Sequence, residues 1–208
     1  MRVRSSLQTA GGLVLALFVG FLLGSSIQPL RSQPSTAQPV APPTGDALVE
    51  RLVREADETG RQMRTDVTAL TELMKRVIRE VEFGGWYPEL NDQGRLLGER
   101  IGVDVEVAVA QTLLAVAEKS VVRNRQEEWV VGRIVDFFQA SRADVQRYRE
   151  KGYPLSSVIL GYGIAKAAKA SPEQVFELRE MGQSWPAVAV TLGVKPQELG
   201  KALQGLFP

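Results

Sequence analysis

The sequence predicts an all-α protein. Three observations support this: a long uncharged N-terminal segment, a long amphipathic stretch without proline, and a helix-forming motif that occurs twice. We expect four parts in chain order: a signal peptide or membrane-anchor helix (residues 1–30), a proline-rich linker (31–45), one long amphipathic helix (46–83) and a helical repeat domain (84–208). The expected architecture is therefore one long helix followed by a stack of short ones.

The N-terminal segment carries no charge between Arg4 and Arg31, and its centre, Leu13 to Leu23, is almost entirely apolar. This short core suits a signal peptide cleaved near Ser26, whereas the whole uncharged stretch reaches the ~20 residues that span a membrane. Positive charge precedes the segment, so both interpretations export the residues that follow. We expect a single-pass protein of the cell membrane with an extracytoplasmic C-terminal part, or a secreted or periplasmic protein if the segment is cleaved.

Small residues recur at every fourth position of this segment: Gly12, Ala16, Gly20 and Gly24. They fall on one face of a helix and allow two helix backbones to approach closely in lipid. The sequence therefore favours a retained anchor, and it suggests a homodimer formed through this ladder and the helix over 46–82.

Composition limits the chemistry that the chain can perform. Cysteine and histidine are both absent, which excludes disulfides, Ser-His-Asp triads, Cys-His pairs and almost every zinc site. No Asp-x-Asp-x-Asp-Gly calcium loop is present, so we expect neither a metal nor a cofactor. The formal net charge of +1 predicts no polyanionic partner. Five prolines between Ile27 and Gly45 predict an extended linker.

The stretch from Asp46 to Glu82 contains no proline, and Asp46 is a good N-cap for a helix. Its apolar residues form a seam with heptad-like spacing: Val49, Leu52, Ala56, Met63, Leu70, Leu73 and Val77, widened by Val53, Val67, Met74 and Val81. Thr59, Gly60 and Asp66 interrupt this seam. The helix either pairs with a second copy as a dimeric stalk or packs along the C-terminal domain of its own chain, and a seam this wide suits both hypotheses.

The segment Phe83 to Pro88 ends this helix, because Gly-Gly and proline interrupt helices. Trp86 and Tyr87 in this segment either form an exposed binding site at the tip of the loop or pack against the core and hold the loop in place. From Asp92 onward we expect a run of short helices.

The internal repeat has an offset of thirty residues: Ser141 to Gly152 corresponds to Ser171 to Gly182. Each copy begins with a capping serine and ends at a glycine, so each unit is expected to be a pair of short helices meeting at a glycine turn. Adjacent copies must stack to cover their apolar faces. A groove between copies near Tyr153 and Tyr162 is a candidate contact surface, and Trp185 is expected in the core.

Residues Gly182 to Val194 read Gly-Gln-Ser-Trp-Pro-Ala-Val-Ala-Val-Thr-Leu-Gly-Val and resemble the helix-turn-helix of sigma-factor-type DNA-binding domains. The resemblance implies two crossing helices, with Lys195 to Gln204 as the recognition helix. That helix contains no arginine, and export would separate it from chromosomal DNA, so nucleic acid is not the expected partner. The repeats also resemble tandem short-helix modules of uncharacterised bacterial envelope proteins, a resemblance that implies no activity.

We expect an exported, membrane-anchored interaction or scaffold protein of the bacterial cell envelope, without catalytic activity, that binds another envelope protein. The candidate partner-binding residues are Trp86, Tyr87, Tyr153 and Tyr162. One alternative is a helix-turn-helix DNA-binding module. A second alternative is a carboxylate-dependent, glycan-acting envelope enzyme, for which the carboxylates near the aromatic loop are Glu82, Glu89, Asp92 and Glu99, although nothing in their spacing selects them.

Overall fold

The computed structural model describes residues 45–82 and 88–207, and within these ranges all regular secondary structure is helical. The all-α prediction is therefore confirmed for this part of the chain. The helices are α2 (Gly45–Glu82), α3 (Pro88–Asn124), α4 (Glu127–Phe138), α5 (Arg142–Glu150), α6 (Leu155–Ala168), α7 (Pro172–Glu180), α8 (Trp185–Thr191) and α9 (Glu198–Leu203).

The expected signal or anchor segment, the linker, and the loop with Trp86 and Tyr87 lie outside the described residues. None of the helices α2 to α9 is long and apolar enough to cross a membrane.

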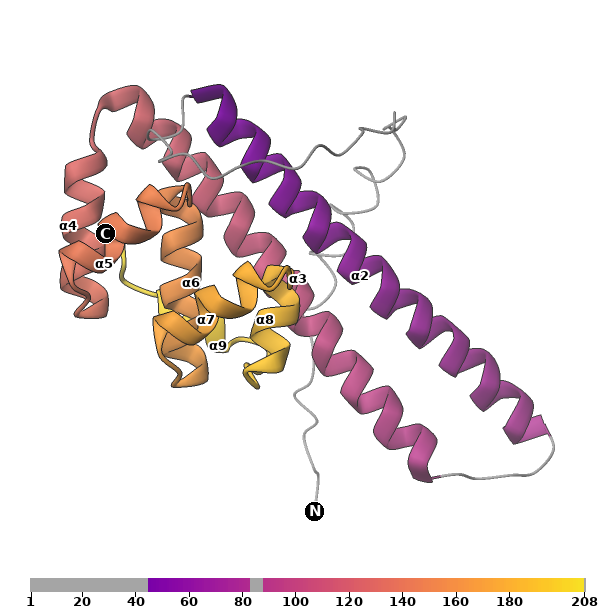
Figure 1. Ribbon diagram of the computed structural model, residues 1–208. Coiled ribbons are helices and arrows are strands. Elements are labelled where there is room, and N and C mark those ends of the chain that lie inside the picture. The colour runs from indigo at the N-terminus through magenta and orange to yellow at the C-terminus, as the bar shows by residue number, and fades with distance from the viewer. Residues whose placement is uncertain (1–44, 83–87, 208) are drawn as a thin grey trace, which may run out of the picture. The chain divides into compact units, whose positions relative to one another are not determined.

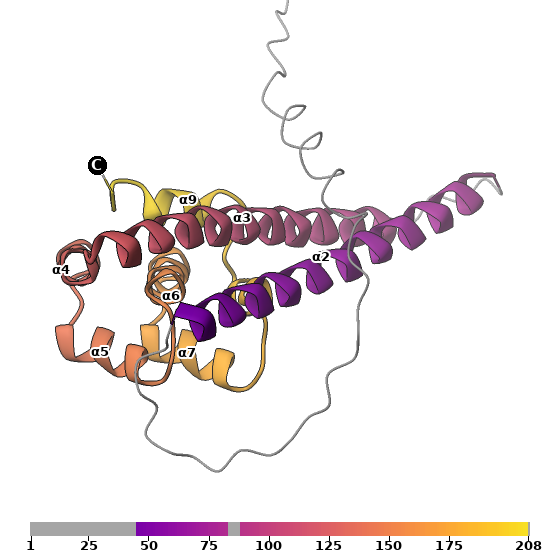
Figure 2. The same ribbon diagram turned by 90° about the horizontal axis from the view of Figure 1, so that it is seen from above.

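Helices α2 and α3 form an antiparallel hairpin (Figure 1). The bounds of α2 match the helix expected from the proline-free, amphipathic stretch. The shorter helices gather near one end of the hairpin, and its other end extends beyond them (Figures 1 and 2). Helix α2 also contacts α8, so it packs along the C-terminal part of its own chain.

Helix α3 corrects the expectation of short helices from Asp92 onward, because it is a single helix of 37 residues. The helix contains Gly94, Gly98 and Gly102, and a glycine inside a helix costs only about 1 kcal/mol relative to alanine. Gly102 also allows a close approach: an added Cβ would lie 2.8 Å from Cγ of Pro196. Short helices therefore begin at α4 rather than at the start of the expected repeat domain.

Helix α6 is the centre of the C-terminal part. Every residue from Leu155 to Ala165 is buried, and Figure 2 shows α6 between α3 on one side and α5 and α7 on the other. Two glycines let neighbouring side chains approach its backbone. A Cβ at Gly161 would lie 2.5 Å from the Phe176 ring, and one at Gly163 would lie 2.7 Å from Leu203.

Helices α5 and α7 begin and end in similar ways. Each has nine residues and a serine N-cap, Ser141 or Ser171, whose hydroxyl accepts a backbone hydrogen bond. At Ser171 the reciprocal capping box with Gln174 is present. Gly152 and Gly182 follow the two helices with φ of 82° and 87°, a backbone conformation that favours glycine.

Candidate interaction surface

The side of α2 that faces the rest of the chain carries polar residues, and most of them find specific partners. The Thr59 hydroxyl donates to Oε1 of Gln111 over 2.6 Å. Arg100 donates to Asp66 over 2.5 Å, and the Gln62 amide donates to the same carboxylate over 3.0 Å. Because an unpaired buried polar group costs free energy, these bonds fix the rotation of α2 against α3.

Glu55 connects α2 to the C-terminal helices. Its carboxylate is buried and accepts hydrogen bonds from the Trp185 indole Nε1 (2.9 Å) and the Ser157 hydroxyl (2.6 Å). The guanidinium of Arg51 donates to it over 3.2 Å, and that of Arg179 lies 3.9 Å away. A buried carboxylate with this many partners holds α2 at one position against α6 and α8.

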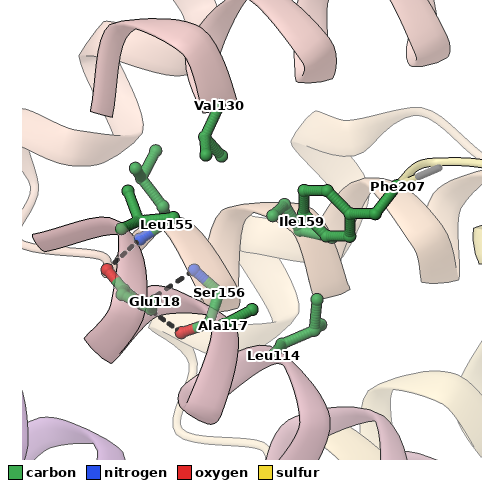
Figure 3. Close-up of a pocket in the computed structure, with 9 residues that line it drawn as sticks. Leu114, Ala117, Glu118, Val130, Leu155, Ser156, Ile159 and Phe207 are labelled. Carbon is green, nitrogen blue, oxygen red and sulfur yellow. Dashed lines mark hydrogen bonds between the residues drawn. The ribbon is translucent and has the colours of Figure 1, made fainter. Parts of the chain in front are cut away.

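Glu118 on α3 makes a similar connection at the start of α6. It accepts hydrogen bonds from the backbone N–H groups of Leu155 (2.8 Å) and Ser156 (2.9 Å), and from the Ser156 hydroxyl (Figure 3). A carboxylate is favourable there because the first N–H groups of a helix have no partner within the helix. The adjoining cavity of about 10 Å³ is large enough for one water molecule but not for a substrate.

Asp104 differs from the other buried carboxylates described above. Both of its carboxylate oxygens are buried and lack a hydrogen-bond partner among the described residues. Burial, followed by the negative charge of Asp66, raises the pKa of Asp104 to about 7, against an ordinary value of 3.8. Asp104 is thus the weak point of the α2–α3 contact, since ionising it places a second charge beside Asp66.

A row of apolar side chains lies on the outside of α2, away from the C-terminal helices. The most exposed members, between 46% and 58%, are Val49, Val53, Val67, Met74 and Ile78. At 100° per residue they fall opposite Arg51, which reaches the Gly152 carbonyl, and Glu58, which pairs with Arg179. Between them lie further apolar or small residues that complete what we call the outer row: Val49, Val53, Ala56, Gly60, Met63, Val67, Leu70, Met74 and Ile78.

Helix α3 extends this surface. Val109 and Val116 are 38% and 68% exposed and lie on the side of α3 opposite the buried Val107 and Leu114. Large exposed apolar patches on a folded protein commonly mark interaction sites. Sequence reasoning included most of the outer-row residues in the predicted seam but did not separate them from the buried ones.

Two of the predicted site residues, Tyr153 and Tyr162, do not form such a surface, and Trp86 and Tyr87 lie outside the described residues. Tyr153 and Tyr162 are each only 5% exposed. Tyr153 packs against the rings of Phe176 and Trp185, and Tyr162 packs against Phe138 and Tyr148. The structure therefore offers no open groove at these two tyrosines. Trp185 is fully buried, as expected from the sequence.

The carboxylates considered for a glycan-acting enzyme lie at the surface of the hairpin. Glu82, Glu89 and Asp92 are exposed. Glu99 pairs with Arg95 and Lys195, and the hydrogen bond from Lys195 lowers the pKa of the Glu99 carboxyl. In residues 45–82 and 88–207 no group of three or more acidic side chains is placed to hold a metal ion.

The segment that resembles a helix-turn-helix forms α8, a turn at Gly193 and the six-residue α9. Glu106 of α3 accepts hydrogen bonds from the backbone N–H groups of Gln197 (2.8 Å) and Gly200 (2.7 Å). A carboxylate therefore occupies the end of the helix that would approach DNA, where a phosphate would otherwise bind. This arrangement disfavours the DNA-binding alternative.

The chain has no significant match among protein-family models, curated protein sequences or solved structures. An inference of function therefore rests on the sequence and on the geometry described above.

Proposed function

We propose that this protein is an exported, membrane-anchored interaction protein of the cell envelope, without catalytic activity, whose protein partner binds the outer row of α2 and the adjoining valines of α3. The observation that carries the proposal is the exposure of an apolar row along nearly the whole length of α2.

The fixed orientation of α2 supports this proposal. A helix with one apolar side normally turns that side inward, because burying apolar area is the dominant favourable term in folding. Here Glu55, Thr59 and Asp66 occupy the buried side and are held by partners on other helices. The apolar row cannot rotate inward without breaking those bonds, so a second molecule is needed to cover it.

The proposed location rests on the sequence. The uncharged segment before Arg31, with positive charge ahead of it, supports export of the helical part. The proline-rich linker would then separate the hairpin from the membrane. The absence of histidine and cysteine supports a role without catalysis.

A photo-crosslinking amino acid tests the proposed surface in the full-length chain in its native cells. We expect adducts with protein from Val53 and Met74, which are exposed outer-row positions. Ala69 is the matched control, because it is exposed on the same helix but lies on the side away from the row. Equal adducts at all three positions, or none at the two row positions, would overturn the proposal.

A further inference from the structure

We infer that the molecule covering the outer row is a second copy of this chain, and that the two α2 helices pack in parallel as a two-stranded coiled coil. This inference rests on the proposed function, because it names the partner of the same surface.

The spacing of the outer row supports a coiled coil. Successive members from Val49 to Met74 are separated alternately by four and three residues, which is the repeat of a two-stranded seam. In heptad letters the a positions are Val53, Gly60, Val67 and Met74, and the d positions are Val49, Ala56, Met63 and Leu70. Every member is apolar or glycine, so the seam has no polar interruption. The interrupting residues Thr59 and Asp66 lie instead in the buried contact with α3.

The small residues in the row allow a close approach of two helices. Ala56 and Gly60 lie one turn apart, and a Cβ added at Gly60 would have only the flexible Arg64 side chain, at 3.8 Å, within 4 Å. The neighbouring heptad positions also suit a second copy. The g positions, such as Leu73, pack toward α3, while the e positions Glu50 and Asp57 are exposed and free to face the α3 helix of the other copy.

Charge complementarity supports the same arrangement. The hydrogen bond between Thr59 and Gln111 sets the register of the hairpin and places Glu50 at the height of Lys119. Lys119 is exposed and follows Val116 by three residues, on the same side of α3. In a parallel dimer Glu50 of one copy approaches Lys119 of the other, so opposite charges meet at the edge of the apolar seam.

The length of the outer row suits an extended interface between two helices. From Val49 to Ile78 the row is about 44 Å long at 1.5 Å per residue, and each helix presents a strip about 10 Å wide. This strip alone covers roughly 440 Å² per chain, about half of what each partner contributes to a standard protein–protein interface, and the exposed Val109 and Val116 of α3 add to it. The parallel direction agrees with the small-residue ladder predicted for the N-terminal segment, because two anchors that pair in one membrane deliver both α2 helices in the same direction.

Disulfide cross-linking tests this inference, because the chain contains no cysteine of its own. Ala56→Cys and Met74→Cys are made separately in the full-length chain and oxidised in native membranes. Each variant is expected to form a disulfide-linked dimer of twice the 22.8 kDa chain mass, because equal positions meet in a parallel coiled coil. Ala69→Cys is the control and is expected to remain monomeric.

Three other outcomes would overturn the inference. If only a mixture of Ala56→Cys and Met74→Cys chains is linked, the helices are antiparallel. If neither position links to itself while the photo-crosslinker at Val53 and Met74 captures a different protein, the partner is another protein and the proposed function stands. If the row positions give neither disulfides nor adducts, both the inference and the proposed function fail.

Discussion

The indole Nε1 of Trp185 donates a 2.9 Å hydrogen bond to the buried carboxylate of Glu55, 130 positions earlier in the chain. The bond joins α8 to α2 at a point where an amphipathic helix would ordinarily present an apolar side chain. It therefore helps to decide which side of α2 is buried and leaves the outer row exposed.

Removing this carboxylate should weaken the fold. Glu55→Ala would leave Trp185, Ser157 and Arg51 without their shared acceptor, and we expect the free energy of unfolding to fall by about 3 kcal/mol. Urea denaturation measures this loss. Glu82→Ala, which removes an exposed glutamate of the same helix outside the outer row, should change stability by no more than about 0.5 kcal/mol. Equal effects of the two substitutions would show that Glu55 has no special role.

Asp104 should make the stability of the hairpin depend on pH. Because its pKa in the folded chain is raised to about 7 from 3.8, the folded state binds the proton more tightly than the unfolded state. Its contribution is therefore favourable in acid and is lost as pH rises from about 4 through about 7. Asp104→Asn removes the titration, and we expect this variant to gain stability relative to the natural chain as pH rises from 5 to 8.

Urea denaturation of Asp104→Asn and of the natural chain, with the midpoint of unfolding measured at pH 5 and at pH 8, checks this expectation. Between pH 5 and the raised pKa of about 7, this loss of stability amounts to at most about 3 kcal/mol, at about 1.4 kcal/mol per pH unit. Glu72, Glu99 and Glu173 have lowered pKa values, so their contributions are lost only below that range, as pH falls through the lowered values. If the difference in the free energy of unfolding between Asp104→Asn and the natural chain is the same at pH 5 and at pH 8, the raised pKa of Asp104 is contradicted.

Two glycine substitutions should have opposite effects. Gly161→Ala places a methyl group 2.5 Å from the Phe176 ring, and we expect a loss of about 1–3 kcal/mol from overpacking. Gly98→Ala in α3 meets no atom within 4 Å and should add up to about 1 kcal/mol through helix propensity. Thermal unfolding followed by circular dichroism distinguishes the two. A loss at Gly98 would contradict the continuous α3 helix.

Substitutions at two adjacent residues of α2 should affect folding and self-association differently. Leu73 is 6% exposed, and Leu73→Ala should reduce stability by about 2–5 kcal/mol. Met74 is 56% exposed, and Met74→Ala should leave the stability of the single chain within about 0.5 kcal/mol while weakening self-association. Denaturation at low protein concentration and sedimentation at high concentration measure the two effects. If Met74→Ala destabilised the single chain as much as Leu73→Ala, the orientation of α2 would be wrong.

Local patterns predicted the helical class and the extent of α2, because a proline-free amphipathic stretch leaves few alternatives, although the helix begins at Gly45 and the expected N-cap Asp46 lies inside it. They failed at α3, which contains Gly94, Gly98 and Gly102 and is one continuous helix where short helices were expected from Asp92 onward. The contact that favours glycine at position 102 comes from Pro196, which is distant in the sequence. No local signal identifies such neighbours.

The sequence predicted only part of the candidate surface, again because distant residues decide which side of α2 is buried. The predicted seam combined Leu52 and Leu73, which pack toward the chain, with Val53 and Met74, which face outward. The unbroken four-three spacing that begins at Val49 could have separated the two sets. Which set is buried depends on partners such as Trp185 and Arg100, and only the folded chain brings these to α2.

Sedimentation equilibrium of residues 39–208, which form one compact unit, tests most directly whether the outer row binds a second copy. We predict a dimer at micromolar concentration for the natural sequence and for Ala69→Glu, and a monomer of unchanged helix content for Val67→Glu. A natural sequence that remains monomeric at high micromolar concentration, or a Val67→Glu variant that still forms the dimer, would contradict the account.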